Sequence, residues 1–157
     1  MKQITLSDLQ QQSEAAAASP RLRAHRNLHP ELSDPVQRLA IAMEPGTYVR
    51  PHRHPHTFEL LFPLRGRFVV LTFDEQGIVM QRTVLGEECK ALEMDAGTWH
   101  AVLSLDNGGV IFEVKHGGYQ PVAEQDSASW APAEGQPGTA ELMAWYASAQ
   151  PGEAYRR

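Results

Sequence analysis

The chain has 157 residues, which corresponds to about one domain, and its composition of 42% hydrophobic and 21% charged residues excludes a wholly disordered or fibrous protein. The net charge of −5 argues against nonspecific nucleic-acid binding, and no apolar run approaches the roughly 18 residues of a membrane span. Cys89 is the single cysteine, which excludes an internal disulfide, and the first residues lack the apolar core of a signal peptide. We therefore predict a cytoplasmic protein without nucleic-acid or membrane partners.

Residues 1–33 are predicted to form a helix followed by an arm. Residues 7–18 are rich in helix-forming residues, with Ser7 as the N-cap, and Ser19-Pro20 ends the helix. Residues 21–33 show neither helical nor alternating periodicity, so we predict an ordered arm or loop there.

Residues 34–118 are predicted to form an all-β barrel. Short runs of β-branched and aromatic residues alternate with turn signals about every 8–12 residues, as in a sandwich or barrel. No helical segment separates these runs, so neighbouring strands are expected to be antiparallel and to form a double-sheet jelly roll. The predicted strands are 36–43, 48–54, 58–64, 67–73, 78–85, 90–94, 99–105 and 110–116.

Residues 119–157 are predicted to form a C-terminal extension. Residues 119–138 are rich in proline, glycine and acidic residues, which is typical of irregular structure. Residues 139–149 have the composition of a short helix that ends before Pro151-Gly152.

Four residues of the predicted barrel are suited to bind a metal ion. His52 and His54 face the same side of an extended strand, and Glu59 opens the next strand. His100 lies on a distant strand and can supply a third imidazole if the sheet closes. Three imidazoles and one carboxylate, with positions left for water or substrate, suit a divalent transition metal: Fe, Mn, Ni, Cu or Zn. Taken alone, such histidines are more often surface or packed residues than ligands.

The spacing of these residues matches the first motif of the cupin superfamily without a gap. Gly46 is followed by five residues, His52-x-His54, four residues, Glu59, six residues and Gly66. The sequence thus resembles cupins, which implies a double-stranded β-helix with a metal at its centre.

The second cupin motif is matched less closely. The segment Asp95-Ala-Gly97-Thr-Trp-His100 keeps the glycine and the histidine but has Asp where the motif has Pro. Cys89 stands at the position of the motif's first glycine, and Ser104 replaces its closing Asn. These departures bear on the shape of the loop more than on metal binding, because the ligand itself is kept.

Further segments between residues 20 and 135 resemble the WbuC-family cupin-fold metalloproteins. They are Arg-x-Arg-x-His-x-Asn-Leu-His over 21–29, and the segments 34–38, 59–67, 109–116 and 130–135. The resemblance implies a small β-barrel with a bound metal, often associated with O-antigen or surface-polysaccharide biosynthesis. It implies His52, His54, Glu59 and His100 as the metal ligands, and it supplies no established reaction.

Three more residues are candidates for binding a small-molecule ligand beside the metal. Arg50 lies two residues before His52, so on an extended strand it would face the same cavity and bind a carboxylate or phosphate. The alternative is that it pairs with a local acid at the barrel mouth. His56 follows Pro55, so it is either a rim residue or a substitute for Glu59. Trp99 would either wall the pocket or fill the core.

Two main classes of function remain open from the sequence. A metal-dependent isomerase, epimerase or dioxygenase would act on a small polar anionic metabolite, for example a sugar-derived one, with Glu59 as the candidate proton acceptor. A non-catalytic metal-dependent binder or sensor is the alternative, and a structural metal between the sheets is a third reading. The edges of a jelly roll also suggest self-association into a homodimer.

Overall fold

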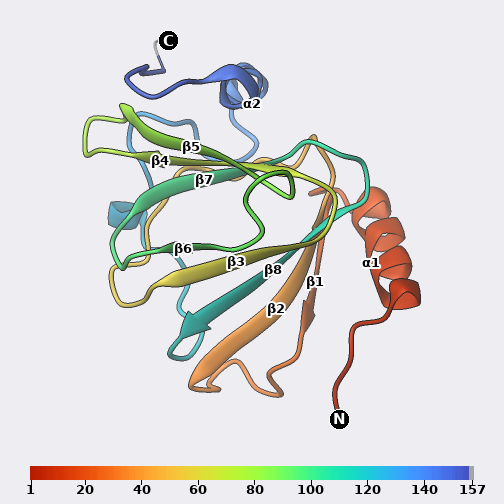
Figure 1. Ribbon diagram of the computed structural model, residues 1–157. Helices are drawn as coiled ribbons and strands as arrows, with labels where there is room; N and C mark the ends of the chain where they lie inside the picture. Colours follow the sequence, from red (N-terminus) through yellow and green to blue (C-terminus); the bar gives the residue numbers. More distant parts are fainter. Residues whose placement is uncertain (156–157) are drawn as a thin grey trace.

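The computed structural model describes residues 1–155 and contains two β-sheets flanked by helices (Figure 1). The helices are α1 (Leu6–Ala18), α2 (Thr139–Ser148) and the 3-10 turn η1 (Glu124–Asp126). The strands are β1 (Arg23–Asn27), β2 (Val36–Met43), β3 (Glu59–Arg65), β4 (Phe68–Phe73), β5 (Val79–Leu85), β6 (Leu92–Met94), β7 (Trp99–Ser104) and β8 (Gly109–His116).

The described strands pair antiparallel in both sheets. The first sheet has the order β1-β2-β8-β3-β6 and the second has the order β5-β4-β7. This arrangement confirms the predicted all-β double-sheet fold, with a helix before it and a short helix after it. Except at residues 48–54, the predicted strands are found with ends that differ by at most two residues.

Strand β1 lies in the segment that the sequence analysis predicted to be an arm. It pairs with β2, with His25 opposite Ile41, and so extends the first sheet. Its residues Arg23, His25 and Asn27 line a cavity, whereas Ala24 packs under helix α1. Four of the five residues of β1 are polar, including those that face inward, so a search for apolar periodicity cannot recognise such a strand.

Residues 48–54, predicted to be a strand, have no regular ladder. His52 forms isolated bridges to His100 and to Ser127, and no further residue of this segment forms a bridge. Pro51 and Pro55 flank the histidines and lack the N–H that a ladder requires. The segment is instead held by individual backbone hydrogen bonds to the C-terminal extension. One of them runs from Ala128 N to the Pro51 carbonyl at 2.8 Å.

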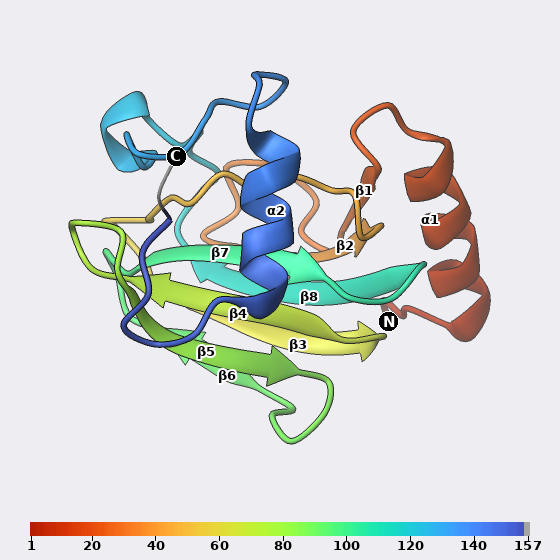
Figure 2. The same cartoon turned by 90° about the horizontal axis from the view of Figure 1, so that it is seen from above.

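Three apolar clusters hold the layers together. The first lies between the two sheets and includes the fully buried Phe68 and Leu85. The second joins α1 to the outer face of β2 and β8 through Leu9, Ala16 and Val110. The third joins α2 to the outer face of the second sheet, across which the helix lies in Figure 2. Each sheet therefore has one face inside the barrel and one face covered by a helix of the same chain.

The N-cap of helix α1 lies two residues earlier than the sequence indicated. The side chain of its N-cap, Thr5, accepts a hydrogen bond from Asp8 N at 3.2 Å, and the Asp8 carboxylate accepts one from Thr5 N at 2.7 Å. This reciprocal capping box satisfies two backbone donors that the helix itself cannot use. Ser7, the predicted N-cap, therefore lies inside the helix.

None of the helices among residues 1–155 is both long and apolar enough to cross a membrane.

Candidate metal centre

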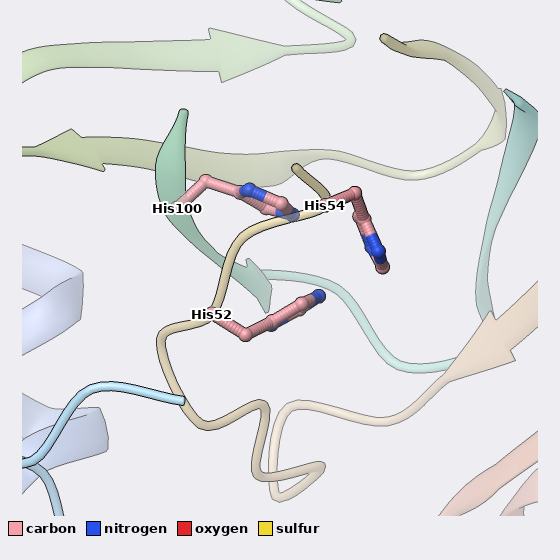
Figure 3. Close-up of side chains that lie close together, drawn as sticks. All are labelled: His52, His54 and His100. Atoms are coloured by element: carbon pink, nitrogen blue, oxygen red, sulfur yellow. The ribbon is translucent and has the colours of Figure 1, made fainter. Parts of the chain in front are cut away.

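Three histidines from separate parts of the chain converge inside the barrel. His52 and His54 come from the extended segment before β3, and His100 comes from β7; their rings point toward a common space in Figure 3. One ring nitrogen of each lies within 4.8 Å of those of the other two. The backbones of His52 and His100 also exchange hydrogen bonds of 3.0 and 2.9 Å, so the two segments are fixed against each other.

Glu59 lies beside two of these histidines at the start of β3. Its Oε2 atom is 3.1 Å from His54 Nε2 and 3.4 Å from His100 Nε2, and the residue is 5% exposed. Glu59 is not part of the compact three-histidine cluster, so its carboxylate flanks His54 and His100 and lies farther from His52.

The hydrogen bonds around the cluster leave its inner atoms free to bind a metal. The Nδ1 atoms of His52 and His100 lie 2.9 Å from the carbonyls of Arg50 and Thr98, which can only accept, so these nitrogens carry the protons. The Nε2 lone pairs then face the cluster, as in metal-ligating histidines. His100 Nε2 and Glu59 Oε2 are buried, yet neither forms a hydrogen bond of good geometry. A cation between these atoms would satisfy them, so the donor set fits a divalent metal.

The buried charges give three of the four residues, His52, His54 and Glu59, the protonation states that metal binding requires. Burial lowers the pKa of His52 to about 3, with the charges of His100 and His54 adding to the effect, and burial also lowers the pKa of His54. Burial opposes ionisation of Glu59, but the positive charge of His100 outweighs it and brings the pKa well below its usual range. In His100 burial is likewise outweighed, by Glu59, so its pKa is raised. His52 and His54 are therefore neutral, and Glu59 is ionised, near neutral pH.

A cavity of about 780 Å³ extends from the histidines along the inner face of the first sheet, over β1, β2 and β8. Among the described residues, four cations and three carboxylates line it, so a divalent ion would make its total charge clearly positive. Those charged residues are Arg21, Arg23, Arg50, Lys115, Glu59, Glu113 and Glu134. The sequence analysis did not single out Glu113 or Lys115 as site residues. The available signal was their alternating position in the otherwise apolar strand β8, which places both on the face of Ile111.

Of the three predicted ligand-binding residues, two line the cavity. The Arg50 guanidinium is 3.1 Å from Glu124 and donates to the Ala128 carbonyl at 3.0 Å, so the pairing with a local acid is present. His56 lines the cavity with its ring 6.2 Å from that of His54. Trp99 points away from His100, lies 4.6 Å from the Arg53 guanidinium and packs against the cluster under α2.

Comparison with known families identifies the chain. A family model described as a domain of unknown function (DUF6016) matches residues 4–85, which is just over half of the sequence. The chain belongs to the DUF6016 family. The matched segment of this DUF6016 protein includes α1, β1 and the residues His52, His54 and Glu59, and it ends before His100. A search of curated proteins finds no match.

Solved structures similar to this DUF6016 protein have the cupin fold. KdgF from Halomonas sp. has a TM-score of 0.50 and 14% identity over 66% of this chain and 84% of its own. BH2720 from Bacillus halodurans has a TM-score of 0.53 and 20% identity over 71% and 81%. An oxalate oxidase in complex with the substrate analogue glycolate has a TM-score of 0.52 and 16% identity over 67% and 55%. These similarities establish the cupin fold, whereas the closer resemblance to WbuC stays a prediction.

Proposed function

We propose that this protein is a metal-dependent cupin that acts on a small, polar, anionic molecule. The proposed ligands are His52, His54, His100 and Glu59. The observation that carries the proposal is that Nε2 of His100 and Oε2 of Glu59 are buried together without hydrogen bonds, beside two histidines that are neutral near pH 7. Buried polar atoms in folded proteins usually have hydrogen-bond partners, so the convergence of these unpaired ligand atoms is best explained by a cation.

Three imidazoles and one carboxylate suit Fe, Mn, Ni, Cu or Zn and leave positions for water or a ligand. When bound, such a metal polarises a carbonyl or phosphoryl oxygen or activates water. The chain's own contribution is to hold the His52 and His100 rings through the carbonyls of Arg50 and Thr98, and to enclose the reacting molecule between the sheets. Carbonyls in this position orient the ligands and support their basicity.

The size and charge of the cavity support a small anionic ligand. A volume of about 780 Å³ lies within the usual range of roughly 300–1,000 Å³ for small-molecule sites. The excess of cations among its described lining residues, together with a divalent metal, favours a molecule that carries a carboxylate or phosphate. Sugar-derived acids have this charge, and their hydroxyl groups match polar lining residues such as Asn27 and Gln37.

The buried carboxyl of Glu113 favours an enzyme over a binder or sensor. It lines the cavity, is 8% exposed and lies outside the proposed ligand set. Burial, and next the charge of Glu59, raises its pKa to about 7, which suits a group that takes up or releases a proton near neutral pH. We therefore propose isomerisation or epimerisation, or oxygenation if the metal is iron, rather than binding alone.

Metal analysis of purified variants tests the centre. We expect about one equivalent of metal in the wild-type protein and a sharp loss in His100→Ala, because one of three imidazole donors is removed. His116→Ala is the matched control, since His116 is exposed at the end of β8 and lies outside the three-histidine cluster. Unchanged metal content in His100→Ala, measured by plasma mass spectrometry, would refute the centre.

Thermal shifts of the metal-loaded protein test the ligand class. Uronic acids, dicarboxylates and nucleotide-sugars are compared with neutral sugars of similar size. Anions are expected to raise the melting temperature and neutral sugars to leave it unchanged, because a ligand that binds the folded state stabilises it. Equal stabilisation by the neutral sugars would contradict the anion proposal, and binding without turnover of any stabilising anion would favour the binder or sensor.

A further inference from the structure

Two oppositely charged side chains occupy the inner face of β8, next to the metal centre. Glu113 and Lys115 are two residues apart on one strand, so both point into the barrel, and both line the cavity. The Lys115 ammonium forms an ion pair with Glu113 Oε1. In the sheet register Lys115 lies opposite Glu59, the proposed carboxylate ligand.

This ion pair lies in the middle of the sheet rather than at its edge. Strand β8 is flanked by β2 on one side and β3 on the other, and the two side chains are only 10% and 20% exposed. A buried ion pair costs about as much desolvation as it gains in attraction, so it is weak evidence for a stabilising role. An apolar pair at these positions would continue the row that Ile111 begins. The location of the pair therefore points to a role in the cavity.

Lys115 differs from the other cations that line the cavity. Arg21 pairs with Glu134 and Arg50 pairs with Glu124, and these two glutamates are 42% and 85% exposed. These guanidinium groups thus pair with acids that are partly or largely exposed. The partner of Lys115, Glu113, has a side chain that is only 10% exposed, so this ion pair is buried in the wall of the cavity. A ligand that reaches the cavity can therefore meet the ammonium by taking the place of Glu113.

The chemistry of Lys115 suits that exchange. Lys115 carries one point charge on a flexible stem, which suits a monoanionic group better than a dianionic phosphate that needs several donors.

We propose that the Lys115 ammonium anchors a carboxylate group of the molecule bound in the cavity, and that Glu113 is the counter-ion which this carboxylate replaces. The inference rests on the proposed function, because it assigns the anionic group of the same ligand. It places the ligand carboxylate on β8, beside the proposed metal ligand Glu59, and it narrows the ligand class to carboxylic acids.

The lysine content of the chain allows a direct test by NMR. The sequence contains three lysines, Lys2, Lys90 and Lys115, so a lysine-labelled sample gives one side-chain ammonium signal for each. Acetate is the probe because it is small enough to reach Lys115 whatever the natural ligand is, and acetamide is its neutral counterpart. In zinc-loaded and in metal-free protein, acetate is expected to shift the Lys115 signal in a saturable way, while Lys2 and Lys90 stay unchanged. An unperturbed Lys115 signal would overturn the inference.

A pair of variants isolates the ammonium. Glu113→Gln keeps the shape of the side chain and removes the competing charge, so acetate is expected to bind several-fold more tightly than to wild type. The double variant Glu113→Gln/Lys115→Met removes the ammonium without leaving a buried carboxylate unpaired. Its affinity for acetate, measured by calorimetry, is expected to be at least about tenfold lower than that of Glu113→Gln, because a charge-assisted hydrogen bond is lost. Equal affinity of the two variants would overturn the proposal.

Lys90→Met is the control for removing a lysine away from the cavity, since Lys90 donates to the Gly86 carbonyl in the loop after β5. The zinc content of every sample distinguishes a failure of the proposed metal centre from a failure of the proposed role of Lys115. Protein that holds zinc but binds acetate equally well with and without the ammonium contradicts the anchor alone. Wild-type protein that holds no metal contradicts the proposed metal centre, and the acetate titration of the metal-free protein still decides the role of Lys115.

Discussion

The two ends of the barrel interior are built from the same strands and have opposite chemistry. On β3 the inward-facing residues run from Glu59 to Leu61, and on β8 they run from Lys115 through Glu113 to Ile111. One end is thus charged and hollow, and the other is filled by the apolar cluster around Phe68. The apolar end supplies the favourable burial that folds the barrel, while the polar end costs desolvation and is retained for its chemistry.

The largest effect is expected at the apolar end. Phe68 is fully buried between the sheets, so Phe68→Ala leaves a cavity that the surrounding strands cannot fill. We expect the free energy of unfolding to fall by about 3–5 kcal/mol in chemical denaturation of the metal-free protein. Variants that fold should still bind metal, because the cluster is at the opposite end. A loss below about 1 kcal/mol would contradict the claim that the apolar end supplies most of the stability of the barrel.

At the polar end a substitution is expected to change how stability depends on pH. The pKa of Glu113 is raised to about 7 from a usual value of 4.5, first by burial and then by Glu59, against the opposing charges of Lys115 and His100. The folded state therefore binds more protons than the unfolded state between those pH values, and this residue lowers stability as pH rises. Relative to wild type, metal-free Glu113→Gln should gain up to about 3 kcal/mol between pH 4.5 and pH 7. Urea denaturation across that range gives the difference, and parallel stability curves for the two proteins would contradict it.

The metal should stabilise only a protein with an intact polar end. At a free metal concentration of about 100 times Kd, the loaded wild-type protein is expected to be about 2.7 kcal/mol more stable than the metal-free form. His52→Ala should lose most of this increment. Because the pKa of His52 is lowered to about 3, chiefly by burial, its removal takes away no charge near neutral pH. Denaturation with metal and with chelator measures the increment, and an undiminished increment in His52→Ala would exclude this residue as a ligand.

The sequence was most informative where local pattern and structure agree. Runs of β-branched and aromatic residues between turn signals predicted β2, β4, β5 and β8, and each of these strands contributes residues to an apolar cluster. The cupin-like spacing indicated His52, His54 and His100 as metal ligands, and the structure places these three residues in one cluster. The spacing could predict that these histidines converge, because the number of residues between them determines where each lies along its strand.

Residues whose environment comes from distant parts of the chain could not be predicted. Strand β1 is polar at four of its five positions and its inward face lines the cavity, so it has no apolar periodicity and was not predicted. Arg50 pairs with Glu124, which lies 74 residues away in an extension without recognisable periodicity. The proximity of Lys115 to Glu59 follows from the register of β3 against β8, which local sequence does not determine.

The smallest effect concerns helix α1, which lies outside the barrel and contacts neither end of its interior. Thr5 and Asp8 form its capping box, whereas Ser7, the residue that the sequence favoured as N-cap, lies within the first turn. Thr5→Ala should therefore lower the free energy of unfolding by about 1 kcal/mol, because the Asp8 N–H loses its partner. Ser7→Ala, with the same kind of side-chain truncation two residues later, should change it by less than about 0.5 kcal/mol, as expected of a surface position. Both variants should bind metal like wild type. If Ser7→Ala proved the more destabilising of the two in urea denaturation, the helix would begin where the sequence placed it.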